Sequence, residues 1–173
     1  MKNKRNLHKT VWSAFFLALA YVLPFLTAGI PEIGSMLSPM HLPVLLCGFL
    51  CSWPFGLAVG AIAPLFRSLT LGVPVLFPKA VCMAVELAAY GAVAGLCYKL
   101  FPKRRGYLYL SLLIAMVTGR LLYGAAMAIC LGASGSAYTF SAFIAGTVTE
   151  AIPGILLQIL LVPIIVDRVT RAK

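Results

Sequence analysis

Residues 40–66 read MHLPVLLCGFLCSWPFGLAVGAIAPLF and contain no Lys, Arg, Asp or Glu. A membrane-spanning helix needs about 20 apolar residues to cross about 30 Å of hydrocarbon. The segment therefore suits either one long helix or two short ones. Its middle, SWPFG at 52–56, contains a Pro and a Gly, which commonly mark turns. The choice between one helix and two decides the number of helices in the whole protein.

The composition of the chain is that of a membrane protein. Of its 173 residues, 62% are hydrophobic and only 10% are charged, and the mean hydropathy is +1.01. A water-soluble domain of this size needs far more polar surface. We therefore expect an all-α integral membrane protein with a single transmembrane domain over residues 1–173.

The positions of the basic residues favour two helices in 40–66. Of the 14 Lys and Arg residues, 11 lie before the first apolar run, in segment 99–105 or in the tail after residue 167. Cytoplasmic loops carry the excess of Lys and Arg in membrane proteins. With six spans all three clusters fall inside. With five spans, four N-terminal basic residues with Arg67 and Lys79 fall inside and the other two clusters, with seven basic residues, fall outside, which is no bias. We therefore predict six transmembrane helices, with both termini inside, at 11–28, 41–52, 55–71, 80–98, 107–131 and 140–166. Clusters placed at the ends of spans also argue against a nucleic-acid surface.

Three ionisable residues lie inside predicted spans, namely Glu86, Arg120 and Glu150. Such residues are rare in membranes and usually face a cavity or a partner. Helical spacing places further pocket-forming residues on the same faces: Met83 and Tyr90 with Glu86, Tyr123 with Arg120, and Thr147 with Glu150. Polar groups beside aromatic and Met side chains are typical of a small-molecule pocket. The alternative is a structural ion pair, although one Arg cannot fully neutralise two carboxylates.

Other residues have two readings each. Arg67 and Lys79 flank an expected outer loop. They would serve either as anchors at the membrane interface or as positive charge at the mouth of a pocket. His41 starts the second span, where a histidine is more often a satisfied polar group than a ligand. Ala14 and Ala18 have the spacing that allows close helix contact, either within the chain or with a partner.

Enzyme signatures are missing from the sequence. It contains no GxxxxGK[ST], HExxH or GxSxG motif. The five Cys lie in apolar sequence without a CxxC pair, which is not the pattern of a metal site. We therefore predict no enzyme activity, no catalytic residues, no cofactor and no metal site.

The chain resembles the substrate-binding S component of energy-coupling factor (ECF) vitamin transporters. The resemblance rests on a basic N-terminus followed by SAFFLALAYVLPF (13–25), a Pro/Gly loop, and SPMHLPVLLCGFLCSWPFGLAVGAIAPL (38–65) within six short spans. It implies a multi-pass protein of the prokaryotic plasma membrane that captures a water-soluble vitamin from outside. The vitamin would pass inwards through a separate membrane T component driven by two ATPases, as in an ABC transporter.

The resemblance also implies roles for particular residues. Ala14 and Ala18 would contact the T component, and loop 29–39 would close over the ligand. The pocket would lie in the outer halves of helices four to six, where Glu86, Arg120 and Glu150 fall.

The identity of the vitamin stays open. Arg120 suits a carboxylate, and the Glu residues suit an amine or hydroxyls. Because MHLPV at 40–44 is similar to pantothenate-type members, a pantothenate-like ligand is the first expectation, with pyridoxine-like and folate-like ligands as alternatives.

A different class of function also fits the composition. A self-sufficient secondary transporter or channel would use Glu86 and Glu150 for proton coupling. Inverted repeats would favour it, and none is evident in the sequence.

Overall fold

The computed structural model describes residues 2–27, 38–133 and 152–171, and these residues are helical apart from short connections. The predicted loops 29–39 and 132–139 lie largely outside them, as does the start of the predicted sixth span, with Thr147 and Glu150. Six α-helices are described: α1 (Lys2–Thr27), α3 (His41–Cys51), α4 (Trp53–Leu71), α5 (Val81–Leu100), α6 (Arg105–Ala133) and α8 (Ile152–Arg171). A single π-helical turn, η1 (Leu76–Ala80), leads into α5.

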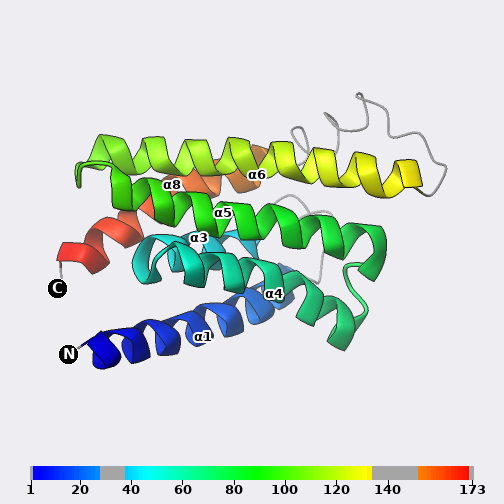
Figure 1. Cartoon of the computed structure of the whole chain (residues 1–173), viewed down its shortest axis with the longest axis horizontal. Coiled ribbons are helices and arrows are strands. Elements are labelled where there is room, and N and C mark those ends of the chain that lie inside the picture. Colours follow the sequence, from blue (N-terminus) through cyan, green and yellow to red (C-terminus); the bar gives the residue numbers. More distant parts are fainter. Residues whose placement is uncertain (1, 28–37, 134–151, 172–173) are drawn as a thin grey trace.

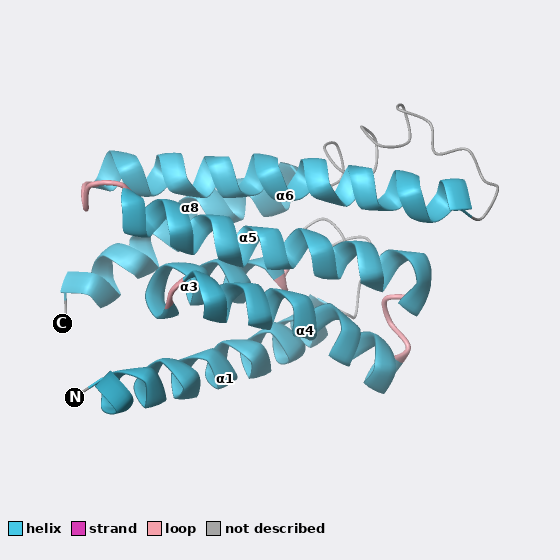
Figure 2. Ribbon diagram, in the orientation of Figure 1, coloured by secondary structure: helices cyan, strands magenta, loops and turns pink. Residues whose placement is uncertain are grey.

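The helices run alternately in opposite directions around a central α5, which packs against α3, α4 and α6 (Figure 1). Helix α1 contacts α3 and α4, and α8 contacts α3 and α6. The start of α1, the connection after α5 and the end of α8 all lie at the same end of the bundle (Figure 2). We call this the basic end, because it carries the three clusters of Lys and Arg.

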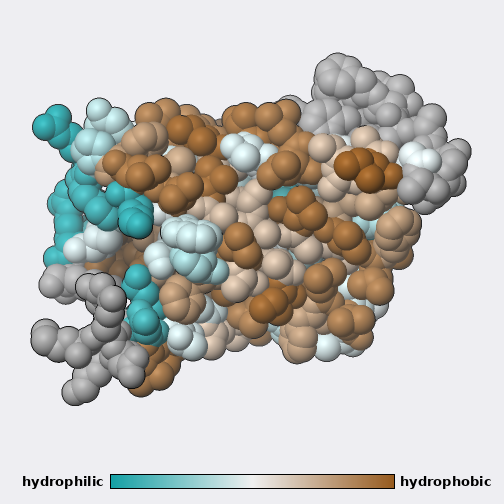
Figure 3. All heavy atoms as spheres, viewed as in Figure 1, coloured by the Kyte–Doolittle hydropathy of each residue, from teal (hydrophilic) through white to brown (hydrophobic). Residues whose placement is uncertain are grey.

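The surface of the bundle agrees with a membrane location. An apolar belt covers the middle of the visible face, and hydrophilic side chains gather at the basic end (Figure 3). Five helices in the described part of the chain are long and apolar enough to cross a membrane. The six-helix, all-α fold predicted from the sequence is therefore confirmed, while the placement of the basic end in the cytoplasm stays a prediction.

The segment 40–66 forms two helices, and the break falls at Ser52. This residue has a φ of 109°, which lies outside the helical region. Pro54 stands in the first turn of α4, where its missing N–H costs no hydrogen bond. The backbone N–H of Gly56 donates to the Ser52 carbonyl at 3.1 Å, which closes the first turn of α4.

Helix α3 is short. Its 11 residues rise about 17 Å, roughly half the thickness of the hydrocarbon region. The second predicted span, 41–52, is therefore a helix that does not cross the membrane by its own length. Because α3 ends at the basic end, its first residue, His41, lies near the middle of the bundle.

Glycines allow α3, α4 and α5 to approach closely. A Cβ built on Gly91 would collide with the backbone of Gly56, and one on Gly60 would collide with the carbonyl of Leu87. On Gly95 a Cβ would lie 2.6 Å from the carbonyl oxygen of Gly48. Backbone therefore packs on backbone along this seam, a common arrangement in membrane helices. The close contact at Leu87 also fixes the backbone next to Glu86.

Candidate functional site

An ion pair lies inside the helical bundle. Glu86 on α5 is only 1% exposed, and its Oε1 lies 3.0 Å from Nη1 of Arg120 on α6. A buried carboxylate is costly unless a cation and hydrogen bonds compensate for its lost hydration. Arg120 supplies the cation, and its side chain is 18% exposed. Glu86 is therefore deeply buried, whereas part of the Arg120 side chain remains exposed.

His41 joins this pair from α3. Its Nε2 lies 3.5 Å from the same Oε1 of Glu86, and its ring packs edge-on against that of Tyr90 with centroids 5.2 Å apart. Tyr90 is fully buried and within interaction range of both Glu86 and Arg120. We call these four residues, His41, Glu86, Tyr90 and Arg120, the central cluster.

The hydrogen-bonding capacity of the central cluster is only partly used. Within the described residues, both ring nitrogens of His41, Oε1 of Glu86 and Nε of Arg120 have no hydrogen-bond partner of suitable geometry. The contact between Glu86 and Arg120 is therefore electrostatic rather than a well-aligned hydrogen bond at Oε1. Buried polar groups without partners are uncommon in proteins, and a ligand is one explanation for them.

The start of α3 adds to the electrostatics of the cluster. The N-terminus of a helix carries a partial positive charge, and α3 begins at His41, beside the Glu86 carboxylate. Pro43 in this first turn lacks an N–H, which removes one of the donors that a helix start leaves unpaired. Arg120 and the helix end thus both place positive charge beside the Glu86 carboxylate.

The cluster lies far from the basic end. At about 1.5 Å per residue, His41, Glu86 and Arg120 lie about 15, 21 and 23 Å from the ends of their helices at the basic end. His41 therefore lies at about the middle of a hydrocarbon layer of about 30 Å, and Glu86 and Arg120 lie past it. The site is therefore nearer the opposite end of the bundle, which is the outer end if the basic end is cytoplasmic.

Of the predicted site residues, the structure brings Glu86, Tyr90 and Arg120 together. Met83 lies one turn before Glu86 on α5 and packs, half-buried, against the core. Tyr123 is half-buried on α6. Thr147 and Glu150 lie outside the described residues.

Arg67 and Lys79 have different surroundings. Arg67 is 8% exposed, and its Nη1 donates a hydrogen bond to the Tyr21 carbonyl at 2.9 Å. Its guanidinium also stacks 4.9 Å from the centre of the Phe25 ring. Arg67 thus fastens α4 to α1, a role not considered at the sequence level, whereas Lys79 is exposed in η1.

The sequence pattern did not identify two buried polar residues as candidates for the site. The position of His41 at a helix start predicts a satisfied polar group, yet neither ring nitrogen has a hydrogen bond among the described residues. Gln158 on α8 is 2% exposed, and its Oε1 has no hydrogen-bond partner in the part of the chain that the structure describes. The signal for Gln158 was present, because it is the chain's single glutamine and lies within a predicted span.

The small residues predicted to contact a partner are accessible. Ala14 and Ala18 are exposed on α1, whereas Ser13, Phe16 and Ala20 are buried against the bundle. The outward face also carries Phe15, which is 54% exposed. Helix α1 therefore has one face on the bundle and one apolar face open to lipid or protein.

Comparison with known proteins identifies the family. The family model described as "ECF transporter, substrate-specific component" matches residues 8–166. The chain is an ECF transporter S component. No curated protein and no solved structure gives a match, so the assignment rests on the family model.

Membership of the family defines the general role of the protein. As an S component it is a multi-pass protein of a prokaryotic membrane, and it binds the substrate of an ECF transporter. It is a transport subunit and not an enzyme, as the sequence predicted. Its partners are a substrate and the ECF module that completes the transporter. This membership disfavours the self-sufficient transporter considered as the alternative.

Proposed function

We propose that this S component captures a small water-soluble vitamin from outside the cell and holds it at the central cluster. The observation that carries the proposal is the buried pair of Glu86 and Arg120 with unused hydrogen-bonding capacity around it. Ionisable groups at membrane depth usually serve a function, and the family supplies one in substrate binding.

The chemistry of the cluster favours a ligand with both an anionic group and hydrogen-bond donors. Arg120 offers its unpartnered Nε–H to a ligand carboxylate, in a charge-assisted hydrogen bond. Glu86 accepts from a ligand hydroxyl, amide or amine, and a His41 ring nitrogen donates or accepts. A pantothenate-like molecule has a carboxylate, hydroxyls and an amide, and is our first candidate. Pyridoxine-like and folate-like ligands are the alternatives.

Residues around the cluster complete the proposed pocket. Met83 and Tyr123 extend it along α5 and α6, and Lys79 is the candidate for positive charge at its mouth. Arg67 is the weaker candidate for that mouth, because its contacts are with α1. Thr147 and Glu150 belong to the proposal on the sequence pattern alone.

The ECF module is proposed to dock on the exposed face of α1. Ala14 and Ala18 lie on that face, and small residues spaced by four allow another helix to approach closely. The module proposed here is a membrane T component with two ATPase subunits.

A screen for thermal stabilisation tests the proposal. The purified chain in detergent is heated with each B vitamin in turn at large excess. A ligand of nanomolar affinity adds several kcal/mol of stability at such concentrations, so one carboxylate-bearing vitamin is expected to raise the melting temperature clearly. If no vitamin changed the melting temperature, the proposed substrate class would be wrong.

A further inference from the structure

A cleft lies at the basic end of the bundle, between the start of α6 and the last turns of α8. Its volume is about 970 Å³. Tyr98 of α5 borders it, about 18 Å along the helix from Glu86. Its charged lining residues are five cations and one carboxylate: Lys103, Arg104, Arg105, Arg168, Arg171 and Asp167.

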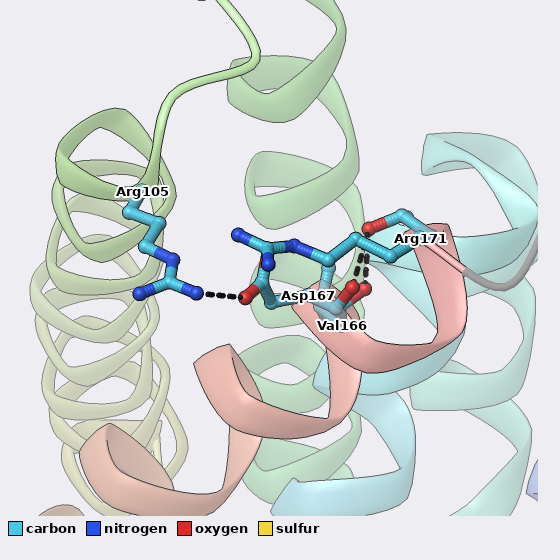
Figure 4. A network of polar contacts seen from close by, with 5 residues as sticks. Arg105, Val166, Asp167 and Arg171 are labelled. Atoms are coloured by element: carbon cyan, nitrogen blue, oxygen red, sulfur yellow. Dashed lines mark hydrogen bonds and ion pairs between the residues drawn. The ribbon is translucent and has the colours of Figure 1, made fainter.

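The single carboxylate of this cleft is already paired. Asp167 accepts from Nη2 of Arg105 at 2.9 Å and from Nε of Arg171 at 3.0 Å (Figure 4). These bonds connect α6 to α8. Among the described residues, no carboxylate forms an ion pair with Lys103, Arg104 or Arg168. The cleft therefore has unneutralised positive charge.

The deeper wall of the cleft is apolar. Tyr109 and Ile164 line it, and they are 41% and 49% exposed. Ile164 lies one helical turn from Arg168, on the side toward the bilayer centre, and Tyr109 has the same relation to Arg105. Further along the same face of α8, Leu160 is 61% exposed. The basic residues of the cleft thus adjoin an exposed apolar strip on α8, formed by Ile164 and Leu160.

We propose that this cleft binds the phosphate headgroup of an anionic phospholipid in the leaflet at the basic end. Basic pockets between transmembrane helices bind such headgroups. The phosphate lies among Lys103, Arg104 and Arg168, and an acyl chain follows Ile164 and Leu160. An acidic protein segment matches the charge but not the apolar strip, which favours the lipid. This site is separate from the central cluster and does not depend on the identity of the vitamin.

Lipid binding to the purified full-length chain tests the proposal. Native mass spectrometry measures the affinity for phosphatidylglycerol and for phosphatidylcholine with the same acyl chains. Arg168→Gln is the test variant, because Arg168 makes none of the contacts to Asp167. Lys99→Gln is the matched control, since it removes one charge at the same end without lining the cleft.

We expect phosphatidylglycerol to bind more tightly than phosphatidylcholine, and Arg168→Gln to weaken it about fivefold, as expected for one basic residue at a membrane surface. Lys99→Gln should change this affinity less than twofold. Equal loss in both variants would mean diffuse surface charge and would overturn the proposal. Competition by inorganic phosphate or glycerol phosphate at equal concentration would overturn the lipid source in favour of a free phosphate. If Arg168→Gln bound lipid normally but failed to assemble with the ECF module, the cleft would be a protein contact instead.

Discussion

At the scale of single residues, the central cluster combines charge with unused hydrogen-bonding groups. Arg120 compensates part of the cost of burying Glu86, while His41 and Arg120 retain nitrogens without hydrogen bonds among the described residues. A structure that used these residues only for stability would be expected to satisfy more of these groups. The cluster is therefore better explained as a binding site whose ligand completes the network.

His41→Phe tests whether a ring nitrogen of His41 binds the substrate, a role that the sequence pattern did not predict. The phenyl ring keeps the packing against Tyr90 but has no nitrogen to offer a ligand. Losing one hydrogen bond to a charged or polar group costs about 1.4 kcal/mol, which is roughly a tenfold loss of substrate affinity. Isothermal titration calorimetry measures this loss.

His8→Phe is the control for His41→Phe, since His8 lies exposed on α1. It should leave the affinity unchanged. Unchanged affinity in His41→Phe as well would remove His41 from the site.

At the scale of helices, the close seam between α4 and α5 positions the cluster. Gly91 and Gly56 meet backbone to backbone, and Gly60 meets Leu87. Any movement of α5 away from α4 would displace Glu86, which adjoins Leu87 in the chain. Packing and binding are therefore coupled at this seam.

Gly91→Ala should destabilise the protein. Its Cβ would collide with the backbone of Gly56, and overpacking of this kind typically costs about 1–3 kcal/mol. Gly106→Ala is the matched control, because a Cβ there meets nothing within 4 Å. We expect the melting temperature in detergent to fall for Gly91→Ala only. An equal effect of both substitutions would mean that the seam does not limit stability.

Ala14→Leu and Ala18→Leu test the exposed face of α1. A leucine at either position would hold a neighbouring helix away without touching the central cluster. We expect normal substrate affinity but weaker co-purification with the T component. Loss of substrate binding with normal co-purification would contradict this assignment.

The sequence predicted the helices better than the site. The turn at 52–56 and the basic clusters correctly predicted six helices, because Pro, Gly and charge act locally. The predicted second span, 41–52, has nearly the bounds of α3 (His41–Cys51), but a helix of that length does not cross the membrane on its own. The pairing of Glu86 with His41 and Arg120 depends on three helices packed together, so spacing along one helix could not establish it. The role of Arg67 was missed for the same reason.

At the scale of the whole molecule, the basic clusters are separated from the proposed binding site. The basic clusters gather at one end, and Glu86 and Arg120 lie about 21 and 23 Å along their helices from that end. If the basic end lies in the cytoplasm, the substrate would enter from outside. The ECF module would contact the exposed face of α1.

Cysteine labelling in intact cells tests this orientation. In a variant with the five native cysteines replaced, Lys103→Cys should react with a membrane-impermeant maleimide only after the cells are opened. Val73→Cys, in the connection between α4 and η1, should be labelled in intact cells. The reverse pattern would place the basic end outside.

The most direct test of the central claim measures substrate affinity and melting temperature together in Glu86→Gln, Arg120→Met and the double variant. A charge-assisted hydrogen bond in a desolvated site is worth about 1.4 kcal/mol or more, so each single variant should bind the vitamin at least tenfold more weakly. We expect Arg120→Met to have the largest loss of affinity and a lower melting temperature, because the buried Glu86 then lacks its cation. The double variant should bind the vitamin at least tenfold more weakly than the wild type even where its melting temperature recovers. A large fall in melting temperature for Arg120→Met that Glu86→Gln restores, with wild-type affinity in the double variant, would show that the pair is only a structural counter-charge.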